Sequence, residues 1–518
     1  MSKIFRPNLP LYLSKRLKPQ VALNEALTTP LSEPLKGFEN YKHGKTSIDN
    51  IKLFDSKITK LSNGLTVATE KAYGTFSTIG VAINSGCRYG EHYPRGTTHV
   101  LQKLAFGSSE YYPNPLETQS FLLKSGALLD CQSTRDCFLY ASSCFNNSQE
   151  DILSIIADTI FRPLILDEEL ENAKEICLLE LEQMIRSPDP EPLVMNWFHS
   201  SAYHSKTLGL DKFVHKPNIN EIEKKHILSY ISQYHSPSNM VVAGVGVDHD
   251  HFVEIVQKHF VDKKPIWESN KENFLIDLPK FDNSVPEYTG GPYFKSNDLA
   301  RRKVSIVEFP DLTHFVLGFE GVSFKDKDFV TFCVMQYILG GGKSFSAGGP
   351  GKGMYTRLYM DVLRYNATMY NAQAFNHSYS DSGVFCIHVG DDRLNLNNSL
   401  DYIIFEFFKL TLPIPDEELN RAKQLLKSQL LMNLEQKPVM FEDLARQVLG
   451  HGKRKSPIEY IKEIDAVTSD DIVRAAEKML LSKPTLVTYG MYKDKINYDM
   501  ACKRIEEVKL QMLKYKEK

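Results

Sequence analysis

The sequence predicts an α+β protein made of two duplicated domains, each with an antiparallel-type sheet flanked by helices. Strand-like and helix-like patterns recur in the same order in both halves. Residues 167–174 (DEELENAK) return 249 residues later, from 167 to 416, as residues 416–423 (DEELNRAK). Residues 240–244 (MVVAG) are echoed 246 residues later, from 240 to 486, by residues 486–490 (LVTYG). A repeat this long indicates a duplicated domain and not a solenoid unit.

Length and composition exclude several classes of protein. A chain of 518 residues exceeds what one hydrophobic core supports. It is 42% hydrophobic and 24% charged, which is ordinary for a globular protein. The net charge of −2 gives no overall attraction to nucleic acid or to an anionic membrane. Apolar runs reach about eleven residues, short of the ~20 that a membrane helix needs, so we expect a soluble or at most peripheral protein.

The eight cysteines include no C-x-x-C pair. This spacing favours free thiols in a reducing compartment over a disulfide framework or a zinc ribbon.

The N-terminal segment is basic and free of acidic residues as far as Glu25. Residues 1–22 carry five lysines and arginines among apolar residues, as a mitochondrial transit peptide does. The alternative is a basic tail, which prolines 7, 10 and 19 favour because they oppose a helix. We expect residues 1–50 to be a transit peptide and a polar N-terminal segment.

The first domain is predicted over residues 51–262. Residues 58–70 indicate two strands around an Asn63-Gly64 turn, and residues 76–86 a third strand. Residues 96–106 indicate a helix capped by Thr97 or Thr98. Strands follow at 127–144 and helices at 151–185.

The second domain, residues 303–518, follows a linker predicted at residues 263–302. That linker is rich in proline, asparagine and charge, and contains Gly290-Gly291-Pro292. In the second domain, residues 313–322 match the strand at 76–86, and residues 329–339 match the helix at 96–106.

A glycine-rich loop is predicted at residues 340–353 (GGGKSFSAGGPGKG), between two ordered runs. Seven of its fourteen residues are glycine, so it buries too little apolar surface to hold one conformation. Long loops of this kind are often functional, although a tolerated surface insertion is the alternative. A phosphate-binding Walker A loop is excluded because Tyr337 stands where that motif needs glycine.

The helix at 96–106 carries a degenerate form of an inverted zinc motif, H-x-x-E-H. In that motif the two histidines bind zinc and the glutamate activates the metal-bound water. Here His99 is followed by Gln102, which takes no proton, and by Lys103, a cation. Glu180 stands on the helix where a third ligand is expected. One histidine and one carboxylate do not make an ordinary zinc site, so we predict no catalytic residue and no metal in this chain.

Two other clusters are weaker candidates. His249-Asp250-His251 suggests a metal pair, but follows a predicted strand in polar sequence and is expected to be surface. The basic run at 301–303 is expected to be the end of the linker.

From about residue 58 the chain resembles the pitrilysin-like (inverzincin) metallopeptidases, family M16, and specifically a non-catalytic member. The most specific segments are GGGKSFSAGGPGKGMYTRLY from residue 340 and NHSYSDSG at 376–383, together with the degenerate HVLQK from His99. The resemblance implies the pitrilysin/LuxS-like metallohydrolase fold.

The resemblance also implies a function. The chain would be the substrate-recognition subunit of a heterodimer in the mitochondrial matrix that removes presequences from imported precursors. A catalytic beta subunit would carry the intact motif and the zinc, and this chain would hold no cofactor. Nucleic acid is not an expected partner, and no transmembrane segment is expected. The loop residues implied to bind substrate are Gly340, Gly341, Gly342, Lys343, Ser344, Phe345, Ser346, Ala347, Gly348, Gly349, Pro350, Gly351, Lys352 and Gly353.

Three questions stay open on the sequence alone. Asp381, Asp391 and Asp392 are candidates for meeting the arginines of a presequence. A structural core subunit of the cytochrome bc1 complex, which shares the fold, is an alternative function. A stand-alone peptidase with an unusual site is another.

Overall fold

The computed structural model describes residues 55–187, 189–269, 274–275, 277, 281–296, 312–343, 354–490 and 496–516. The chain separates into two units, Met1–Leu53 and Phe54–Lys518, and every described residue belongs to the second. The predicted transit segment at 1–50, the basic run at 301–303 and residues 344–353 of the glycine-rich loop lie outside the described residues.

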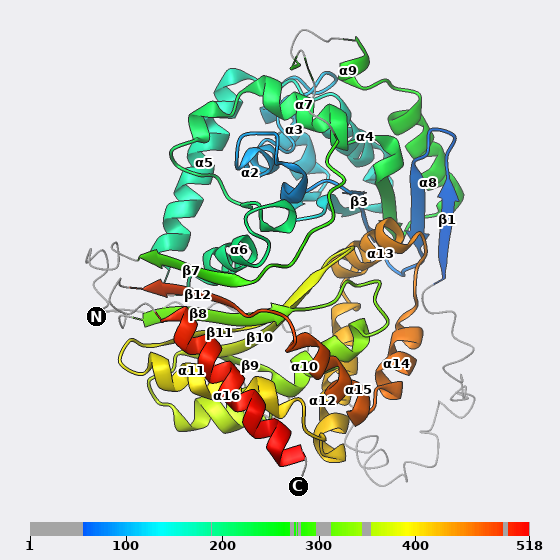
Figure 1. Ribbon diagram of the computed structural model, residues 1–518. Helices are drawn as coiled ribbons and strands as arrows, with labels where there is room; N and C mark the ends of the chain where they lie inside the picture. Colours follow the sequence, from blue (N-terminus) through cyan, green and yellow to red (C-terminus); the bar gives the residue numbers. More distant parts are fainter. Residues whose placement is uncertain are drawn as a thin grey trace, which may run out of the picture. The chain divides into compact units, whose positions relative to one another are not determined.

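The first half is built on a mixed sheet (Figure 1). Its strands, in the order β1-β2-β6-β3-β5-β4, are β1 (Ser56–Lys60), β2 (Thr66–Glu70), β6 (Met240–Val245), β3 (Phe76–Ile83), β5 (Phe138–Phe145) and β4 (Leu128–Ser133). The hairpin predicted at 58–70 is confirmed: β1 and β2 are antiparallel, and the turn uses Gly64 at φ +92°. β2 and β6 run parallel, so the sheet is not wholly antiparallel.

The second half repeats this topology. Its strands, in the order β7-β12-β8-β11-β10-β9, are β7 (Gly291–Ser296), β12 (Thr485–Gly490), β8 (Leu312–Glu320), β11 (Gly383–Asp392), β10 (Asn371–Ser378) and β9 (Gly341–Lys343). β7 and β12 form the parallel pair, as β2 and β6 do in the first sheet. β7 lies in the segment expected to be a linker, so the last described residues of that segment belong to the second sheet. The domain boundaries themselves stay a prediction.

Helices cover both sheets. In the first half they are α2 (Thr97–Lys103), α3 (Pro115–Lys124), α4 (Gln149–Phe161), α5 (Asp167–Arg186), α6 (Glu191–Ala202), α7 (Lys224–Tyr234), α8 (His249–Val256) and α9 (Ile266–Ser269). The cap predicted for α2 is wrong, because the residue at its N-cap is Gly96, at φ +87°. A Cβ there would lie 2.5 Å from the Cα of Val214, so the close approach of that segment requires glycine.

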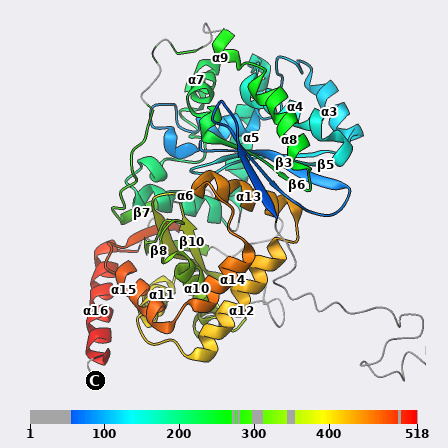
Figure 2. The same cartoon turned by 90° about the vertical axis from the view of Figure 1, so that its right-hand side faces the viewer.

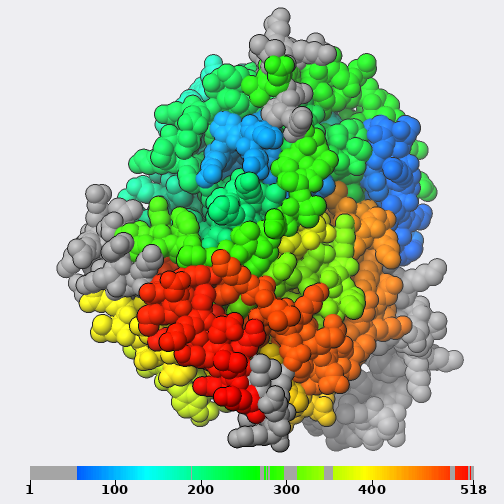
Figure 3. Space-filling view, in the orientation of Figure 1, coloured from blue at the N-terminus to red at the C-terminus, as the bar shows by residue number. Residues whose placement is uncertain are grey.

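The helices of the second half are α10 (Phe329–Leu339), α11 (Leu396–Lys409), α12 (Asp416–Asn433), α13 (Lys437–His451), α14 (Pro457–Ala466), α15 (Ser469–Met479) and α16 (Tyr498–Lys516). α10 has the bounds that the sequence predicted. α16, red in Figure 3, lies beside the yellow residues of α11, and Arg504 of α16 forms an ion pair with Asp401 of α11 at 2.9 Å.

The two halves exchange one helix each. In Figure 2, α6 and α13 lie between the two sheets. α6 belongs to the first half but packs on the second sheet, where Phe198 contacts Val316 and Val487. α13 belongs to the second half but packs on the first sheet, where Phe441 lies among Ala82 and Ala243. Because α6 and α13 occupy equivalent places in the repeat, the exchange is reciprocal.

A glycine in a central strand receives each exchanged helix. Successive strand residues point to opposite faces, so in β3 Ile79 and Val81 face the first core while Gly80 faces α13. A Cβ on Gly80 would lie 2.7 Å from the ring of Phe441, and one on Gly318 of β8 would lie 2.6 Å from the ring of Phe198. The missing side chains therefore let each phenylalanine reach the strand backbone.

Ion pairs also join the halves. Arg88, from the first half, donates to both carboxylate oxygens of Asp381 at 3.0 and 2.7 Å. Arg454, from the second half, donates to Glu70 at 2.9 Å, and both side chains are almost fully buried. Arg454 also bonds Asp443, so this buried cation is shared by one carboxylate from each half.

Candidate functional site

The degenerate motif forms a hydrogen-bonded cluster between α2 and α5. His99 and Lys103 lie one turn apart on α2, and Glu180 lies opposite them on α5. The Nε2 atom of His99 is 3.1 Å from Oε2 of Glu180, and the ammonium group of Lys103 donates to Oε1. Glu180, predicted at the position of a third zinc ligand, therefore has two hydrogen-bond partners from α2.

The hydrogen bonds define the state of each group. The backbone N–H of Val214 donates to Nδ1 of His99 at 3.4 Å, so Nε2 carries the proton that faces Glu180. Burial lowers the pKa of His99 and outweighs the bond to Glu180, so the ring is neutral near pH 7. Burial alone would raise the pKa of Glu180, but the bonds from Lys103 and His99 outweigh it and hold that pKa below its ordinary value.

These residues do not fit a zinc ion. The ammonium of Lys103 is bound to Glu180, where a metal would need that carboxylate for itself. Gln102 is turned away, since its amide donates to the carbonyl of Cys131 at 2.9 Å, so no base is available to activate water. Among the residues that the structure describes, no group of three or more histidine, cysteine, aspartate or glutamate side chains is arranged to hold a metal.

The glycine-rich segment begins in ordered structure. Gly340 ends α10 at φ +57°, and β9 pairs with residues 371–373 of β10. A Cβ on Gly341, at φ +86°, would lie 2.0 Å from the carbonyl oxygen of Ala372. The expectation that the whole stretch lacks one conformation is therefore wrong for residues 340–343, where glycine serves tight packing.

Two of the three candidate aspartates are used inside the fold. Asp391 is fully buried and accepts hydrogen bonds from Ser399 and Asn395. Asp381 is committed to its ion pair with Arg88. Asp392 accepts from the backbone N–H of Leu394 at the edge of α11. The expectation that Asp391 meets a peptide is corrected by its burial.

His249 is the first residue of α8. Its two ring nitrogens lie 2.8 Å from the hydroxyls of Thr59 and Thr69, so the ring joins α8 to the first hairpin. All eight cysteines are free thiols, as expected.

Comparison with known families and proteins decides the relationship. Residues 66–213 match the family described as "Insulinase (Peptidase family M16)", and residues 221–426 match "Peptidase M16 inactive domain". The chain is 42% identical to the mitochondrial-processing peptidase subunit alpha of Caenorhabditis elegans, over 89% of each protein. It is 39% identical to the human subunit of the same name, over 91% of this chain and 88% of that one. The chain belongs to peptidase family M16, and within that family it groups with proteins named as alpha subunits.

Solved structures show the same fold for this M16 chain. It superposes on a chain of "Complex III2 from Candida albicans, Inz-5 bound" with a TM-score of 0.70 and 19% sequence identity. The match covers 87% of this chain and 99% of that one. At this identity the likeness is one of fold alone. Within the described part of the M16 chain, no helix is both long and apolar enough to cross a bilayer.

Proposed function

We propose that the chain is the non-catalytic, substrate-recognition subunit of a mitochondrial processing peptidase, which removes N-terminal presequences from imported precursors. Its relatives of 39–42% identity carry the name of the alpha subunit of that enzyme. The chain is accordingly a mitochondrial protein with a partner subunit. We place it in the matrix, paired with a beta subunit that supplies the zinc and the catalytic base.

The observation that carries the non-catalytic role is the ion pair between Lys103 and Glu180. A lysine ammonium bound to the third-ligand carboxylate brings positive charge to the place of a dication, and like charges repel. Gln102 adds no proton-accepting group at the second critical position. The two helices that carry the motif positions, α2 and α5, are therefore in place, but their side chains oppose a zinc centre.

Substrate handling is assigned to the loop at residues 340–353. Gly340–Lys343 anchor its first end to α10 and β10, and the chain resumes in described structure at residue 354. Glycine-rich backbone exposes N–H and C=O groups with few side chains in the way, which suits peptides of varied sequence.

Zinc content tests the proposal. The isolated wild-type chain should bind no zinc stoichiometrically and should cleave no presequence peptide. The double variant Gln102→Glu with Lys103→His restores H-x-x-E-H opposite Glu180, and we expect it to bind about one zinc per chain. It serves as the matched control in the metal analysis. Tight one-to-one zinc, or peptide cleavage, in the wild-type chain alone would falsify the non-catalytic assignment.

The alternative of a cytochrome bc1 core subunit is supported by fold alone, since the matched complex III2 chain is 19% identical. Affinity purification of the native protein separates the two functions. Recovery in a respiratory membrane complex, without a soluble peptidase partner, would favour the alternative.

A further inference from the structure

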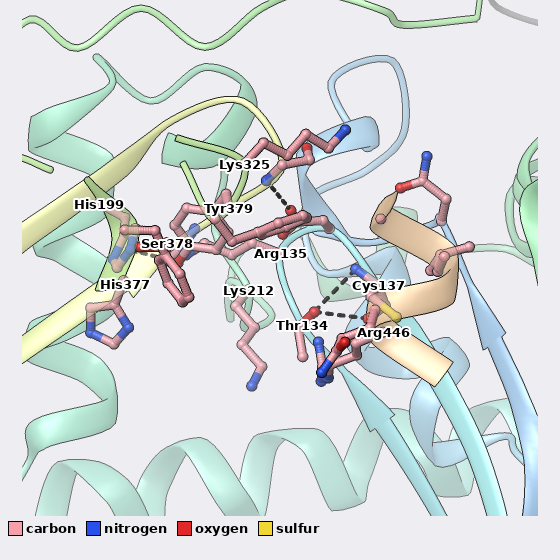
Figure 4. Close-up of a pocket in the computed structure, with 18 of the residues that line it drawn as sticks. Thr134, Arg135, Cys137, His199, Lys212, Lys325, His377, Ser378, Tyr379 and Arg446 are labelled. Carbon is pink, nitrogen blue, oxygen red and sulfur yellow. Dashed lines mark hydrogen bonds between the residues drawn. The ribbon is translucent and has the colours of Figure 1, made fainter. Parts of the chain in front are cut away.

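A cavity of about 650 Å³ lies where the two halves meet (Figure 4). Equivalent parts of the repeat enclose it. The turns that follow β4 and β10, at residues 134–137 and 378–380, meet there, together with the exchanged helices α6 and α13. The cavity is separate from the Lys103–Glu180 cluster, since none of His99, Lys103 and Glu180 lines it. Its size is typical of small-molecule sites.

Four cations line this cavity, and three of them, Arg135, Lys212 and Arg446, lack carboxylate partners to different degrees. Arg135 is 6% exposed, yet its guanidinium donates only to neutral oxygens of Leu208, Leu210 and Asn196 at 2.7–2.9 Å. A buried cation bonded only to neutral groups keeps its full charge in the field of the cavity.

Among the described residues the ammonium of Lys212 makes no hydrogen bond or ion pair, and it lies 5.8 Å from the centroid of the Phe213 ring. Arg446 bonds Glu442 through Nε at 2.8 Å, which leaves its two terminal nitrogens directed elsewhere. In Figure 4 the charged ends of Lys212 and Arg446 lie on the same side of the cavity. Burial lowers the pKa of Lys212, and the nearby charges of Arg135 and Arg446 lower it further.

The carboxylates of the wall are largely committed to other partners. Asp136 accepts from the backbone N–H of Ser380 at 3.2 Å and faces Arg88. Asp443 is paired with Arg454 and accepts from Gln447. Glu191, at the start of α6, is the remaining acid of the lining, and Lys325 adds a fourth cation. The cavity therefore keeps an excess of positive charge.

Two histidines in the wall, the buried His199 and the half-buried His377, are neutral. Burial lowers the pKa of His377 to about 4, with Arg135 adding to the effect, and its Nε2 is buried with no hydrogen-bond partner. His199 donates from Nδ1 to the carbonyl of Met195 and accepts at Nε2 from Tyr379. Burial is the main cause of their neutral state, and the charge of Arg135 adds to it.

We propose that this cavity binds a small organic anion, with its phosphate or carboxylate groups held by Lys212 and Arg446 and its apolar part against the aromatic wall. That wall consists of Phe213, Phe324, Phe329, Tyr379 and Tyr460. Paired cations with free donors are the usual receptors for such groups. An arginine-rich presequence is repelled by the same charges, so the site is separate from the proposed recognition of precursors and stands without it.

Thermal unfolding of the full chain tests the site, with pyrophosphate and citrate as probes against chloride at equal ionic strength. We expect either anion, at about 10 mM, to raise the Tm of the wild-type chain, because a ligand that binds only the folded state stabilises it. Lys212→Gln should raise the Tm of the free protein, since it removes like-charge repulsion. It should also weaken anion binding roughly tenfold or more. Lys462→Gln, an exposed lysine of α14, is the matched control and should keep the wild-type response.

A second measurement reads Lys212 directly. Limited acetylation followed by peptide mass spectrometry should show that Lys212 is acetylated in the free protein and protected by pyrophosphate. The acetylation of Lys462 should be the same with and without pyrophosphate. The proposal is overturned if neither anion raises the wild-type Tm, if Lys212→Gln keeps the response, or if Lys212 is acetylated equally with and without pyrophosphate. A lower Tm of free Lys212→Gln would equally overturn it, because Lys212 would then have a structural partner.

Discussion

Replacing Phe441 with alanine is expected to destabilise both halves of the molecule together. Phe441 is 1% exposed and sits on α13, the helix that the second half places on the first sheet. Its ring reaches the backbone of β3 because Gly80 has no side chain. The substitution therefore leaves a cavity in the interface between α13 and the first sheet.

The size of the effect depends on the surroundings. Buried phenylalanine to alanine substitutions cost about 3–5 kcal/mol, more where the site cannot collapse. Three small residues of the sheet, Gly80, Ala82 and Ala243, belong to the surroundings of Phe441 and cannot extend into the space that its ring would leave. We expect a loss near the upper end, about 4 kcal/mol in the free energy of unfolding. That is a large share of the roughly 5–15 kcal/mol typical of a folded domain.

The two tryptophans of the chain report the two halves separately. Trp197, on α6, stacks near Tyr293 and Tyr489 of the second sheet, with ring centroids 6.1 and 5.2 Å away. Trp267, on α9, packs on Phe161 of the first half at 5.8 Å. Urea unfolding followed by fluorescence, in Trp197→Phe and Trp267→Phe backgrounds, therefore gives one midpoint for each half.

Both midpoints should fall by the same amount when Phe441→Ala is added. Phe405→Ala, at a side chain 47% exposed on α11, is the control and should change stability by no more than about 0.5 kcal/mol. The reasoning is refuted if Phe441→Ala costs less than about 1 kcal/mol. It is also refuted if only the Trp267 midpoint falls, because the halves would then unfold independently.

Four further predictions concern the candidate sites and the N-terminus. His99→Ala should lower stability by about 1–3 kcal/mol because His99 is buried, yet leave processing by the assembled complex nearly unchanged; a loss of several hundred-fold in turnover with normal assembly would contradict it. Deleting residues 344–351 should spare folding, assembly and zinc content but strongly reduce precursor cleavage; normal cleavage would make the loop a passive insertion, and alanine in place of its glycines should give a milder defect. Glu180→Gln should cost less than about 1 kcal/mol at pH 7, since the carboxylate is 39% exposed. The pKa of Glu180 is depressed in the folded state, so its contribution is present above the unfolded pKa of about 4.3 and is lost as pH falls through the folded pKa; unfolding at pH 7 and at about pH 3 should show the difference from wild type disappear. Mass spectrometry of the native protein should find a start after Ser2 and before Ile58, and an intact Met1 or Ser2 start would count against the transit peptide.

Sequence patterns predicted those features of the fold that depend on interactions between residues close together in the chain. The hairpin with Gly64 and the helix Phe329–Leu339 were readable because turn chemistry and apolar periodicity lie within a few residues. The duplication was readable because its most similar segments open α5 and α12 and form β6 and β12. The α+β class followed from these elements.

Long-range contacts were not readable in the same way. The sequence around Phe441 does not predict that its ring will pack on the strand that contains Gly80, 361 residues earlier in the chain. The chemistry of the degenerate motif was predicted, but the bond between Lys103 and Glu180 joins helices that only the fold brings together. The burial of Asp391, and the packing of Gly341 against Ala372, depend on neighbours distant in sequence for the same reason.

The exchange of α6 and α13 imposes an order on how the chain is made and matures. The face of the first sheet that carries Ala82, Leu139 and Val241 is covered by residues 437–451, which emerge from a ribosome or an import channel long after the strands of that sheet. Until then that face is a bare apolar surface, the kind of surface that chaperones bind and that aggregates when they are absent. If the chain is cut between the halves, the first fragment lacks α13, which covers its sheet, and the second fragment lacks α6, which covers the other sheet. Truncated products should therefore be held by chaperones and degraded, and a half-length chain should not accumulate as a usable domain.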